Sequence, residues 1–267
     1  MIHLRLIMQP SRTRSVALVL IGTAVLWQIV VVAMQIPDYL LPAPSQILAE
    51  VAASPGWYLR HAFYTLQSCL IGFGIAFGVG VLSAIGIVYS RFLEDTLYTL
   101  LVSLNSIPKI ALAPLFIIWL GTGLSSKVAI SALIALFAIV IDTVLGLRSA
   151  DPDALDLSRS LRASPMQILF TIRFPSALPA MFAGMKVAIS LSLVGAIAGE
   201  FVASEVGLGY VILVAQGMFQ TTRVFAAIFI LGVLGTVLFY LVDLAERLLI
   251  PWHVSHRGGH VTGAHEA

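Results

Sequence analysis

Long apolar runs separated by short polar stretches make up most of this chain. Six of these runs are long enough to cross a bilayer as helices, which takes about 20 residues for roughly 30 Å of hydrocarbon. They cover residues 15–35, 62–89, 96–120, 127–147, 181–203 and 224–250. The pattern therefore predicts an all-α integral membrane protein with six transmembrane helices.

The composition supports this prediction. The chain has 267 residues, of which 59% are hydrophobic and 10% are charged, and its mean hydropathy is +1.00. A typical soluble domain is about 25% charged, so an ordinary soluble fold is excluded and membrane lipid is an expected partner. The net charge of +2 does not indicate a nucleic-acid partner, and the single cysteine, Cys69, cannot form an intrachain disulfide.

The lysine and arginine positions predict which side of the membrane each connection occupies. Positive residues collect on one side of the predicted spans, as they do in cytoplasmic loops. That side holds Arg5, Arg12, Arg14, Arg91, Arg148, Arg159, Arg162, Arg173, Arg247 and Arg257. The other side holds Arg60, Lys127 and Arg223. Both termini are therefore expected in the cytoplasm, and the first run is expected to stay as a span because it is too long for a signal peptide.

The chain divides into three predicted parts. Residues 1–58 comprise an N-terminal cytoplasmic segment, the first span and an outer loop, and residues 59–250 form the main helical core. Residues 251–267 hold four of the six histidines among several glycines. We expect this last part to be a disordered cytoplasmic tail rather than a metal site.

Small residues mark two of the spans as close-packing helices. Gly74 and Gly78 lie one turn apart in the second span, and Gly195 and Gly199 repeat that spacing in the fifth. Small side chains let helix backbones approach closely inside a membrane. Dimerisation and packing within the chain both fit this pattern, and packing within the chain is the favoured interpretation.

The third span has the features of a helix that lines a cavity. Pro108 and Pro114 each remove a helical hydrogen bond, and broken helices occur at membrane depth where they are buried in protein or line a wet cavity. Lys109 lies between them, and a charge at mid-span costs about 3 kcal/mol, so such residues usually face an interior cavity. The alternatives are that Lys109 snorkels to the interface or pairs with Glu200 or Asp142.

Other polar residues in the spans are candidates for the same cavity. The full set of candidate pathway residues is Asn105, Pro108, Lys109, Ser190, Ser192 and Glu200. For the two serines the alternative is a hydrogen bond to their own helix backbone. Glu200 either contacts a substrate or a binding protein or caps the packing of its span against the third span, and the structural role is favoured.

A polar segment, residues 151–175, interrupts the apolar pattern. Asp151 followed by Pro152 is a typical helix cap and first turn, and a helix is predicted over about 152–163. Apolar and charged side chains fall on different faces of this helix. The apolar ones are Ala154, Leu157 and Leu161, and the charged ones are Asp156, Arg159 and Arg162.

A second helix start follows within the same segment. Ser164, Pro165 and Gln167 have the spacing of a capping box, and the helix that they start is predicted to end at Pro175. Two short amphipathic helices of this kind are suited to docking in a groove on another cytoplasmic protein. The alternative is an elbow that folds back on its own bundle.

The spacing of this segment resembles the cytoplasmic EAA motif of binding-protein-dependent ABC importer permeases. That motif reads roughly E-A-A, three residues, G, nine residues, I-x-L-P. The residues in the matching places are Asp156, Leu157 and Ser158, then Arg162, then Ile172, Phe174 and Pro175. Because arginine replaces a glycine suited to left-handed backbone, the bend between the helices is expected at Ser164 and Pro165 instead.

The resemblance extends over about residues 41–252. The stretches "LPAPSQIL", "IPKIALAPLFIIWLGTG", "RSADPDAL" and "AGEFVASEVGLGYVI" are similar to the nitrate/sulfonate/taurine group of type I permeases. The resemblance implies a type I ABC importer permease fold in the bacterial inner membrane, a second permease copy, two ATPase subunits and an extracytoplasmic solute-binding protein. The implied ATPase-coupling residues are Asp156, Leu157, Ser158, Arg159, Leu161, Arg162, Met166, Ile172 and Pro175.

No lysine of the chain ends a phosphate-binding G-x-x-x-x-G-K-[ST] loop. The chain is therefore expected not to be an enzyme and to need no cofactor, with ATP and Mg²⁺ used by the partner ATPase. The expected cargo is a small polar or anionic solute of the nitrate, sulfonate or taurine kind. The alternatives are a pyrimidine or thiamine precursor carried by the same machinery and, in another class, an ion-coupled secondary transporter.

Overall fold

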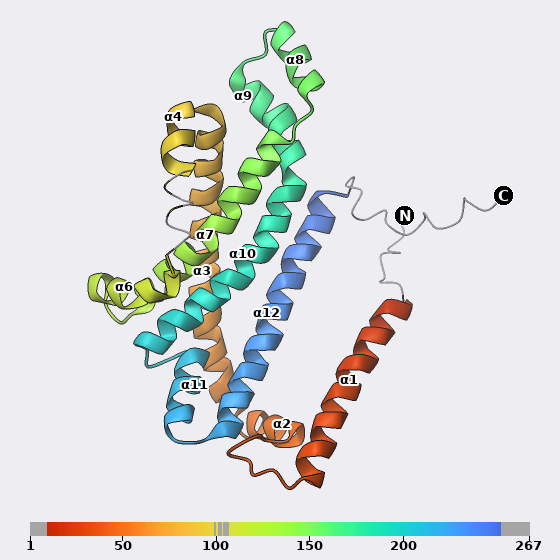
Figure 1. Ribbon diagram of the computed structural model, residues 1–267, viewed down its shortest axis with the longest axis vertical. Coiled ribbons are helices and arrows are strands. Elements are labelled where there is room, and N and C mark those ends of the chain that lie inside the picture. The colour runs from red at the N-terminus through yellow and green to blue at the C-terminus, as the bar shows by residue number, and fades with distance from the viewer. Residues whose placement is uncertain (1–9, 99, 101–102, 104–106, 252–267) are drawn as a thin grey trace, which may run out of the picture.

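Long helices dominate the computed structural model, which describes residues 10–98, 100, 103 and 107–251 (Figure 1). The four longest core helices are α3 (Pro55–Tyr89), α7 (Leu124–Arg148), α10 (Phe174–Val202) and α12 (Thr221–Leu249). The N-terminal helices are α1 (Pro10–Ala33) and α2 (Pro44–Ala53). The shorter elements are α4 (Arg91–Leu93), η1 (Glu94–Tyr98), η2 (Lys109–Leu112), α6 (Ala113–Leu120), α8 (Pro152–Ser160), α9 (Pro165–Ile168), η3 (Leu169–Arg173) and α11 (Leu208–Gly217). The prediction of an all-α protein is confirmed for these residues.

Four described helices are long and apolar enough to cross a membrane. They are Pro55–Tyr89, Leu124–Arg148, Pro165–Val202 and Thr221–Leu249. Ala17–Ala33 and Lys109–Leu120, which belong to the first and third predicted spans, are shorter apolar helices. The described residues therefore confirm four of the six predicted spans as long membrane helices.

The third predicted span, 96–120, is not one helix. The chain forms the π-turn η1, and then η2 and α6 after Pro108. Pro108 has extended backbone and precedes η2, and Pro114 occupies the first turn of α6. Proline lacks an N–H and clashes with the preceding turn, so it starts a helix more readily than it continues one. The predicted break is thus confirmed, and it is complete rather than a kink.

The predicted end of the second elbow helix at Pro175 is wrong. From α9 the chain continues through the π-turn η3 into α10, so that Pro165–Val202 forms one membrane helix of 38 residues. A π-helical turn inserts an extra residue and relaxes the helical hydrogen-bond ladder, and here it ends two residues before Pro175. The helix therefore accommodates the proline, and the fifth span begins before its predicted start at residue 181.

Small residues hold α3, α7 and α10 together. A Cβ atom at Gly195 would lie 2.7 Å from the Cα of Ser131, and one at Gly72 would meet the same serine side chain from α3. Packing within the chain is thus confirmed for the fifth span. For Gly74 and Gly78 the prediction of packing within the chain is wrong, because nothing in the described chain lies within 4 Å of a Cβ atom at either position.

Helix α1 lies apart from the core helices (Figure 1). It contacts α2, and Trp27 packs against Phe225 of α12 with ring centroids 5.9 Å apart. The backbone N–H of Ser45 donates to the side chain of Gln28 over 3.0 Å. These few contacts connect α1 to the rest of the molecule at one of its ends.

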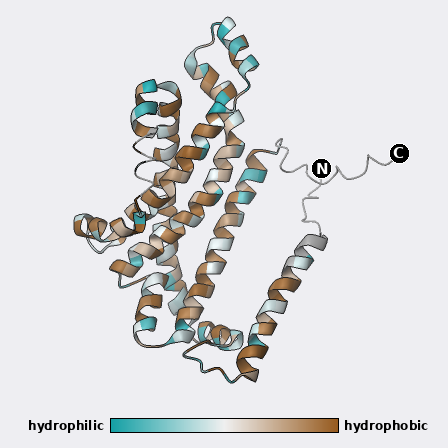
Figure 2. Cartoon of the chain, viewed as in Figure 1, coloured by the Kyte–Doolittle hydropathy of each residue, from teal (hydrophilic) through white to brown (hydrophobic). Residues whose placement is uncertain are grey.

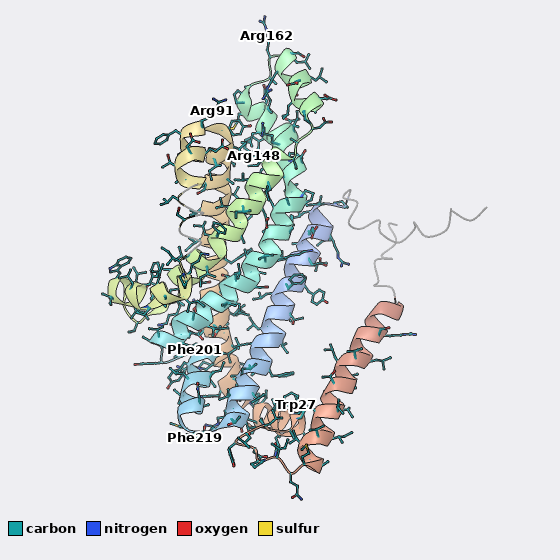
Figure 3. All side chains as sticks on the ribbon, viewed as in Figure 1. Trp27, Arg91, Arg148, Arg162, Phe201 and Phe219 are labelled. Atoms are coloured by element: carbon teal, nitrogen blue, oxygen red, sulfur yellow. The ribbon has the colours of Figure 1, made fainter. Side chains whose placement is uncertain are left out.

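The two ends of the bundle differ in polarity. Hydrophilic residues are concentrated on α8 and α4 at one end, while the helices between the ends are mostly hydrophobic (Figure 2). Arg91, Arg148 and Arg162 lie toward that polar end, and Phe201 and Phe219 lie toward the other (Figure 3). We call residues 151–175 the elbow and this end of the bundle the elbow end.

Candidate functional site

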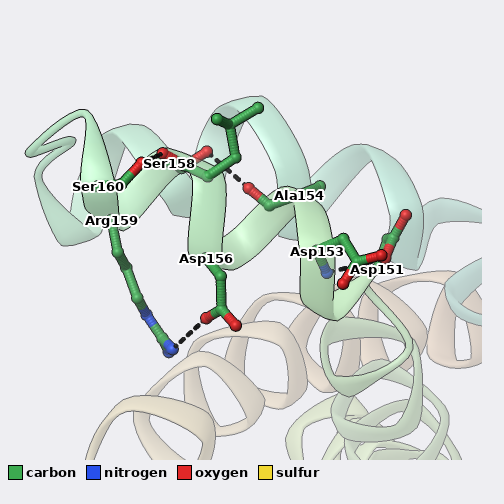
Figure 4. A network of polar contacts seen from close by, with 8 residues as sticks. Asp151, Asp153, Ala154, Asp156, Ser158, Arg159 and Ser160 are labelled. Atoms are coloured by element: carbon green, nitrogen blue, oxygen red, sulfur yellow. Dashed lines mark hydrogen bonds and ion pairs between the residues drawn. The ribbon is translucent and has the colours of Figure 1, made fainter.

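The first helix of the elbow, α8, is capped as the sequence predicts. The side chain of Asp151 accepts a hydrogen bond from the N–H of Asp153 over 3.0 Å, and Pro152 occupies the first turn. Asp156 and Arg159 form an ion pair of 3.1 Å on the surface (Figure 4). The Ser158 hydroxyl donates to the carbonyl of Ala154 over 2.9 Å. The helix is therefore stabilised by its own residues.

Helix α8 ends at Ser160 because the chain then turns left-handed. Arg162 has a φ of 57°, and its N–H donates to the carbonyl of Arg159 over 2.9 Å. The N–H of Ala163 donates to the carbonyl of Ser158 over 3.0 Å. This pair of bonds is a Schellman motif, which usually places glycine where Arg162 stands.

The expected bend at Ser164 and Pro165 is therefore corrected. The reversal begins at Arg162, in the place that the EAA motif gives to glycine, and the arginine adopts the left-handed backbone itself. Ser164 and Pro165 start the next helix instead. The predicted capping box is confirmed, since Gln167 donates from its N–H to the Ser164 hydroxyl and accepts from the Ser164 N–H over 2.7 Å.

The elbow leaves large apolar side chains exposed. Leu157 is 63% exposed, Leu161 75%, Met166 62% and Phe170 62%. These four residues, which we call the elbow apolar residues, lie on a segment that also carries the exposed Asp156 and Arg159 pair. Of the other predicted coupling residues, Ile172 and Pro175 are half-buried where the elbow joins α10.

Contacts that the sequence reasoning missed fix the base of the elbow to the bundle. The Tyr89 hydroxyl donates to the carbonyl of Pro165 over 3.1 Å, and the Arg173 guanidinium lies over the Tyr89 ring at 5.8 Å. Arg173 also donates to the carbonyl of Leu147 over 2.9 Å. In the sequence, the only indication of these contacts was that Tyr89, an aromatic residue, and Arg173, a basic residue, lie near the ends of predicted spans. They connect the elbow to the ends of both α3 and α7.

The candidate pathway residues separate into open and buried positions. Asn105 lies outside the described residues. Pro108 is exposed, and Lys109 is half-buried with its ammonium 5.1 Å from the centre of the Phe137 ring on α7. Ser190 is exposed on α10 and donates to the carbonyl of Lys186, which is the backbone bond expected as its alternative.

Ser192 is fully buried where three helices cross. Its hydroxyl donates to the carbonyl of Cys69 on α3 over 2.9 Å. The hydroxyl of Ser131 on α7 donates to the Ser192 carbonyl over 2.8 Å. The structure thus places Ser192 in the packing of α3, α7 and α10, and a pathway role for it stays a prediction.

Glu200 is also fully buried, near the end of α10 opposite the elbow. Its carboxylate accepts from the Thr65 hydroxyl over 2.8 Å and from the N–H of Gly209 over 2.7 Å. The Thr65 hydroxyl in turn accepts from the N–H of Leu208 over 2.9 Å. Carboxylates are stabilised at helix N-termini, and Glu200 occupies that place at α11. The geometry favours the structural role, and a substrate contact stays a prediction.

The connection between α10 and α11 is closed by two further groups. The N–H of Gly207 donates to Nδ1 of His61 over 3.0 Å. Lys127, also fully buried, donates to the carbonyls of Thr122 and Ala203 and interacts electrostatically with Glu200. We call Thr65, Lys127, Glu200, Gly207 and Gly209 the Glu200 corner. Lys127, which was predicted on the outer side of the membrane, is the buried counter-charge of this corner.

Beside the Glu200 corner lies a hollow of about 480 Å³. Its lining residues are Tyr64, Thr122, Gly123, Ala203, Ser204, Glu205 and Val206. The described residues contain no group of three histidine, cysteine, aspartate or glutamate side chains that could hold a metal ion.

A second charged cluster, absent from the predicted sites, joins α10 to α12. The Lys186 ammonium lies 2.5 Å from carboxylate oxygens of both Asp243 and Glu246, and Arg247 pairs with Asp243 at 2.8 Å. The two positive and two negative charges balance. The i, i+4 spacing of Asp243 and Arg247 was the only sequence signal, because the partner on α10 is far away in the chain.

Long apolar helices, a broken third span and an exposed amphipathic elbow define the class of helical membrane transport subunits that work with another protein. Residues 76–251 match the family described as the binding-protein-dependent transport system inner membrane component, and the chain belongs to this family. The chain is thus a permease subunit of an ABC importer, as the resemblance predicted, and not an enzyme in itself. The alternative of an ion-coupled carrier is set aside.

Several relatives cover most of the chain. It is 36% identical to the riboflavin transport system permease protein of Chloroflexus aurantiacus over 233 residues, which cover 86% of this chain and 87% of the relative. It is 34% identical to the formylaminopyrimidine transport permease protein of Halalkalibacterium halodurans, with 80% and 86% covered. It is 30% identical to the putative aliphatic sulfonates transport permease protein of Bacillus subtilis, with 87% and 85% covered.

The fold is similar to a solved structure. The inward-facing MetNI methionine ABC transporter contains a chain that matches with a TM-score of 0.65 and 21% identity, covering 72% of this chain and 96% of that one. At this identity the likeness shows a shared fold. Importers of this family work with an ATPase and a solute-binding protein.

Proposed function

We propose that two copies of this chain form the translocation pathway of an importer in the bacterial inner membrane. Both termini and the elbow face the cytoplasm, where two ATPase subunits bind, and an extracytoplasmic solute-binding protein delivers the cargo. The chain itself needs no cofactor in this proposal, since the ATPase subunits use ATP and Mg²⁺. The arginine-rich elbow end supports this orientation, because positive residues favour the cytoplasmic side.

One observation carries the proposal: the exposure of the elbow apolar residues. Apolar side chains at the centre of a contact, surrounded by charges, are the usual composition of a protein–protein interface. Helix α8 does not fold back on the bundle, because Leu157 and the cap residue Leu161 remain more than half exposed. Permeases of this family work with an ATPase subunit. A groove on that subunit is therefore the proposed binding site for the elbow apolar residues.

The continuous helix explains how movement at the elbow reaches the membrane. The second elbow helix and the fifth span form the single helix Pro165–Val202. Its base is held by Tyr89 of α3 and by the Leu147 carbonyl of α7. When ATPase closure displaces the elbow, α10 moves with it and carries the packed helices toward their other arrangement, which is a two-state transition.

A charge reversal tests the docking role of the elbow. The double variant Asp156→Lys, Arg159→Glu keeps an ion pair within α8 but reverses the charges that a partner meets. The chain should still insert in membranes, and co-purification of the ATPase subunit should be lost. The matched control is Glu50→Arg, Arg223→Glu, which reverses a 2.9 Å pair far from the elbow. An unchanged yield of the complex in the elbow variant contradicts the docking role.

The cargo of the proposed importer is a small polar solute. The sequence resemblance favoured an anion of the nitrate, sulfonate or taurine kind, with a pyrimidine or thiamine precursor as the second candidate. The second candidate has a specific observation in its favour: the relative named for formylaminopyrimidine transport is 34% identical, against 30% for the sulfonate relative.

A further inference from the structure

Asp142 on α7 differs from the other buried and half-buried charged residues of the long helices. Lys127, Lys186 and Glu200 each have named partners, whereas Asp142 forms no hydrogen bond or ion pair with any residue that the structure describes. It is half-buried beside Gly184, where a Cβ atom would lie 2.8 Å from a carboxylate oxygen. A carboxyl group within a membrane helix is costly unless it faces water or a polar partner.

Asp142 stands at the edge of an open face formed by α7 and α10. Helix α3 packs on one side of this pair, with Gly80 against Ile139 of α7 and Cys69 against the Ile189 carbonyl of α10. Elsewhere η2 and α6 contact the pair, and part of the described α10 surface is exposed. The exposed residues on α10 recur at i, i+4, i+7 and i+11, and so form one stripe. They are Ala183, Val187, Ser190 and Val194.

The open face carries polar groups on an otherwise apolar surface. Ser190 lies in the exposed stripe, and Asp142 contacts α10 at Gly184, one residue from Ala183 of the same stripe. Lys109 belongs to η2, which contacts both α7 and α10, and its ammonium lies over Phe137. On a face that contacts only lipid, these polar groups would lose their hydration at a cost in free energy. On a face that lines an aqueous pathway they stay hydrated.

We propose that Asp142 lines the translocation pathway and presents a negative charge to the cargo. This inference rests on the proposed importer function and names its substrate class. A pathway that contains Asp142 as well as Lys109 is not uniformly positive, so it disfavours a small inorganic anion by like-charge repulsion. It suits an uncharged solute rich in N–H and O–H donors, which the carboxylate oxygens accept.

Charged thiol reagents measure the proposed charge without knowledge of the cargo. The variant Ser190→Cys is expressed in the full chain with its ATPase subunit and reconstituted in liposomes. The native Cys69 is fully buried, so the unsubstituted chain serves as the unlabelled control. The rates of modification by a cationic and an anionic methanethiosulfonate are compared, with the mass of the intact chain as readout.

The thiol introduced at position 190 should react with both reagents, because it faces water. Adding Asp142→Asn should lower the ratio of cationic to anionic rates about fivefold or more, since one nearby charge acts on the two reagents in opposite directions. The matched control is Asp95→Asn, which removes an equal charge from an exposed site in η1 and should leave the ratio unchanged. If Ser190→Cys lowers the yield, Val187→Cys probes the same stripe.

Two results overturn the inference and leave the proposed function standing. The first result is that, in a preparation that contains the ATPase subunit, the introduced thiol reacts with neither reagent. The α10 stripe then faces lipid or packed protein and not water. If the ratio of the two rates is the same with and without Asp142→Asn, Asp142 presents no negative charge to the pathway. Loss of the ATPase subunit from the unsubstituted chain instead contradicts the proposed function, so the two failures are distinguishable.

Discussion

The elbow and the Glu200 corner both connect long helices, and they are built in opposite ways. The elbow exposes Leu161 and its charged pair, and its two helix starts are capped by hydrogen bonds between neighbouring residues. The corner buries Glu200 and Lys127 completely and joins α3, α7, α10 and α11 through them. The corner is completed within this chain, whereas the elbow leaves its apolar side chains exposed.

This difference predicts where the stability of the subunit resides. A buried charge that loses its partner destabilises a protein strongly, whereas an exposed ion pair contributes little. Substitutions in the corner should therefore lower the free energy of unfolding, and substitutions in the elbow should chiefly affect binding. The following variants test that contrast in order of expected effect.

The largest effect is expected for Gly207→Ala. Gly207 has φ 121° and ψ 161°, a backbone region that is essentially restricted to glycine. A Cβ atom there would also collide with the Glu200 carboxylate. The free energy of unfolding should fall by about 3 kcal/mol or more, measured by thermal unfolding in detergent.

The matched control is Gly74→Ala within α3, where nothing lies within 4 Å of the added methyl group. Alanine favours a helix over glycine by about 1 kcal/mol, so this control should be neutral or slightly stabilising. A Gly207→Ala variant as stable as the control would contradict the geometry of the corner.

Glu200→Ala should have the next largest effect. The substitution leaves the Gly209 N–H without its acceptor and the Lys127 ammonium without its counter-charge. The free energy of unfolding should fall by about 3 kcal/mol. Glu200→Gln keeps an acceptor oxygen and should cost less. The comparison variant in the elbow is Asp156→Ala, which breaks an exposed pair and should change the free energy of unfolding by no more than about 0.5 kcal/mol. Equal losses at the two sites would remove the distinction between corner and elbow.

The smallest effect is expected for Arg162→Gly, and it should be a gain. Left-handed backbone costs a residue with a side chain about 1 kcal/mol relative to glycine. The end of α8 should open less often, seen as slower amide hydrogen exchange at Leu161, Arg162 and Ala163, whose N–H groups bond back into α8. Ser160→Gly, two residues earlier and in helical backbone, should speed exchange, at a cost of about 0.5 kcal/mol. Faster exchange in Arg162→Gly would show that its side chain stabilises the turn.

The sequence predicted features that depend on neighbouring residues. The start of α8 at Asp151 and Pro152 and the capping box at Ser164 and Gln167 were correct, because a cap is a contact between residues two or three apart. The break at Pro108 was correct because proline acts on its own turn. The same local reasoning failed at Pro175, where the π-turn η3 absorbs the proline inside a continuing helix.

The candidate site was predicted in part for the same reason. The elbow residues form one short segment, so their spacing was enough to find them. The sequence suggested Glu200 and Lys109 as charges in apolar spans, but it did not indicate Thr65 or Lys127 as partners of Glu200. Thr65 and Glu200 are separated by 135 positions, and no periodicity of one helix shows which residue of another helix it meets.

The amino-acid sequence by itself determined the long apolar helices, the break in the third span and the amphipathic elbow, because hydrophobicity and capping act over a few residues. The tertiary structure alone decided that Lys127 is buried beside Glu200, that Arg162 turns left-handed, and that Asp142 stands at an open face. Each of these depends on which helices pack together. That choice is made by close contact between small residues such as Gly195 and Ser131, which lie 64 positions apart in the chain.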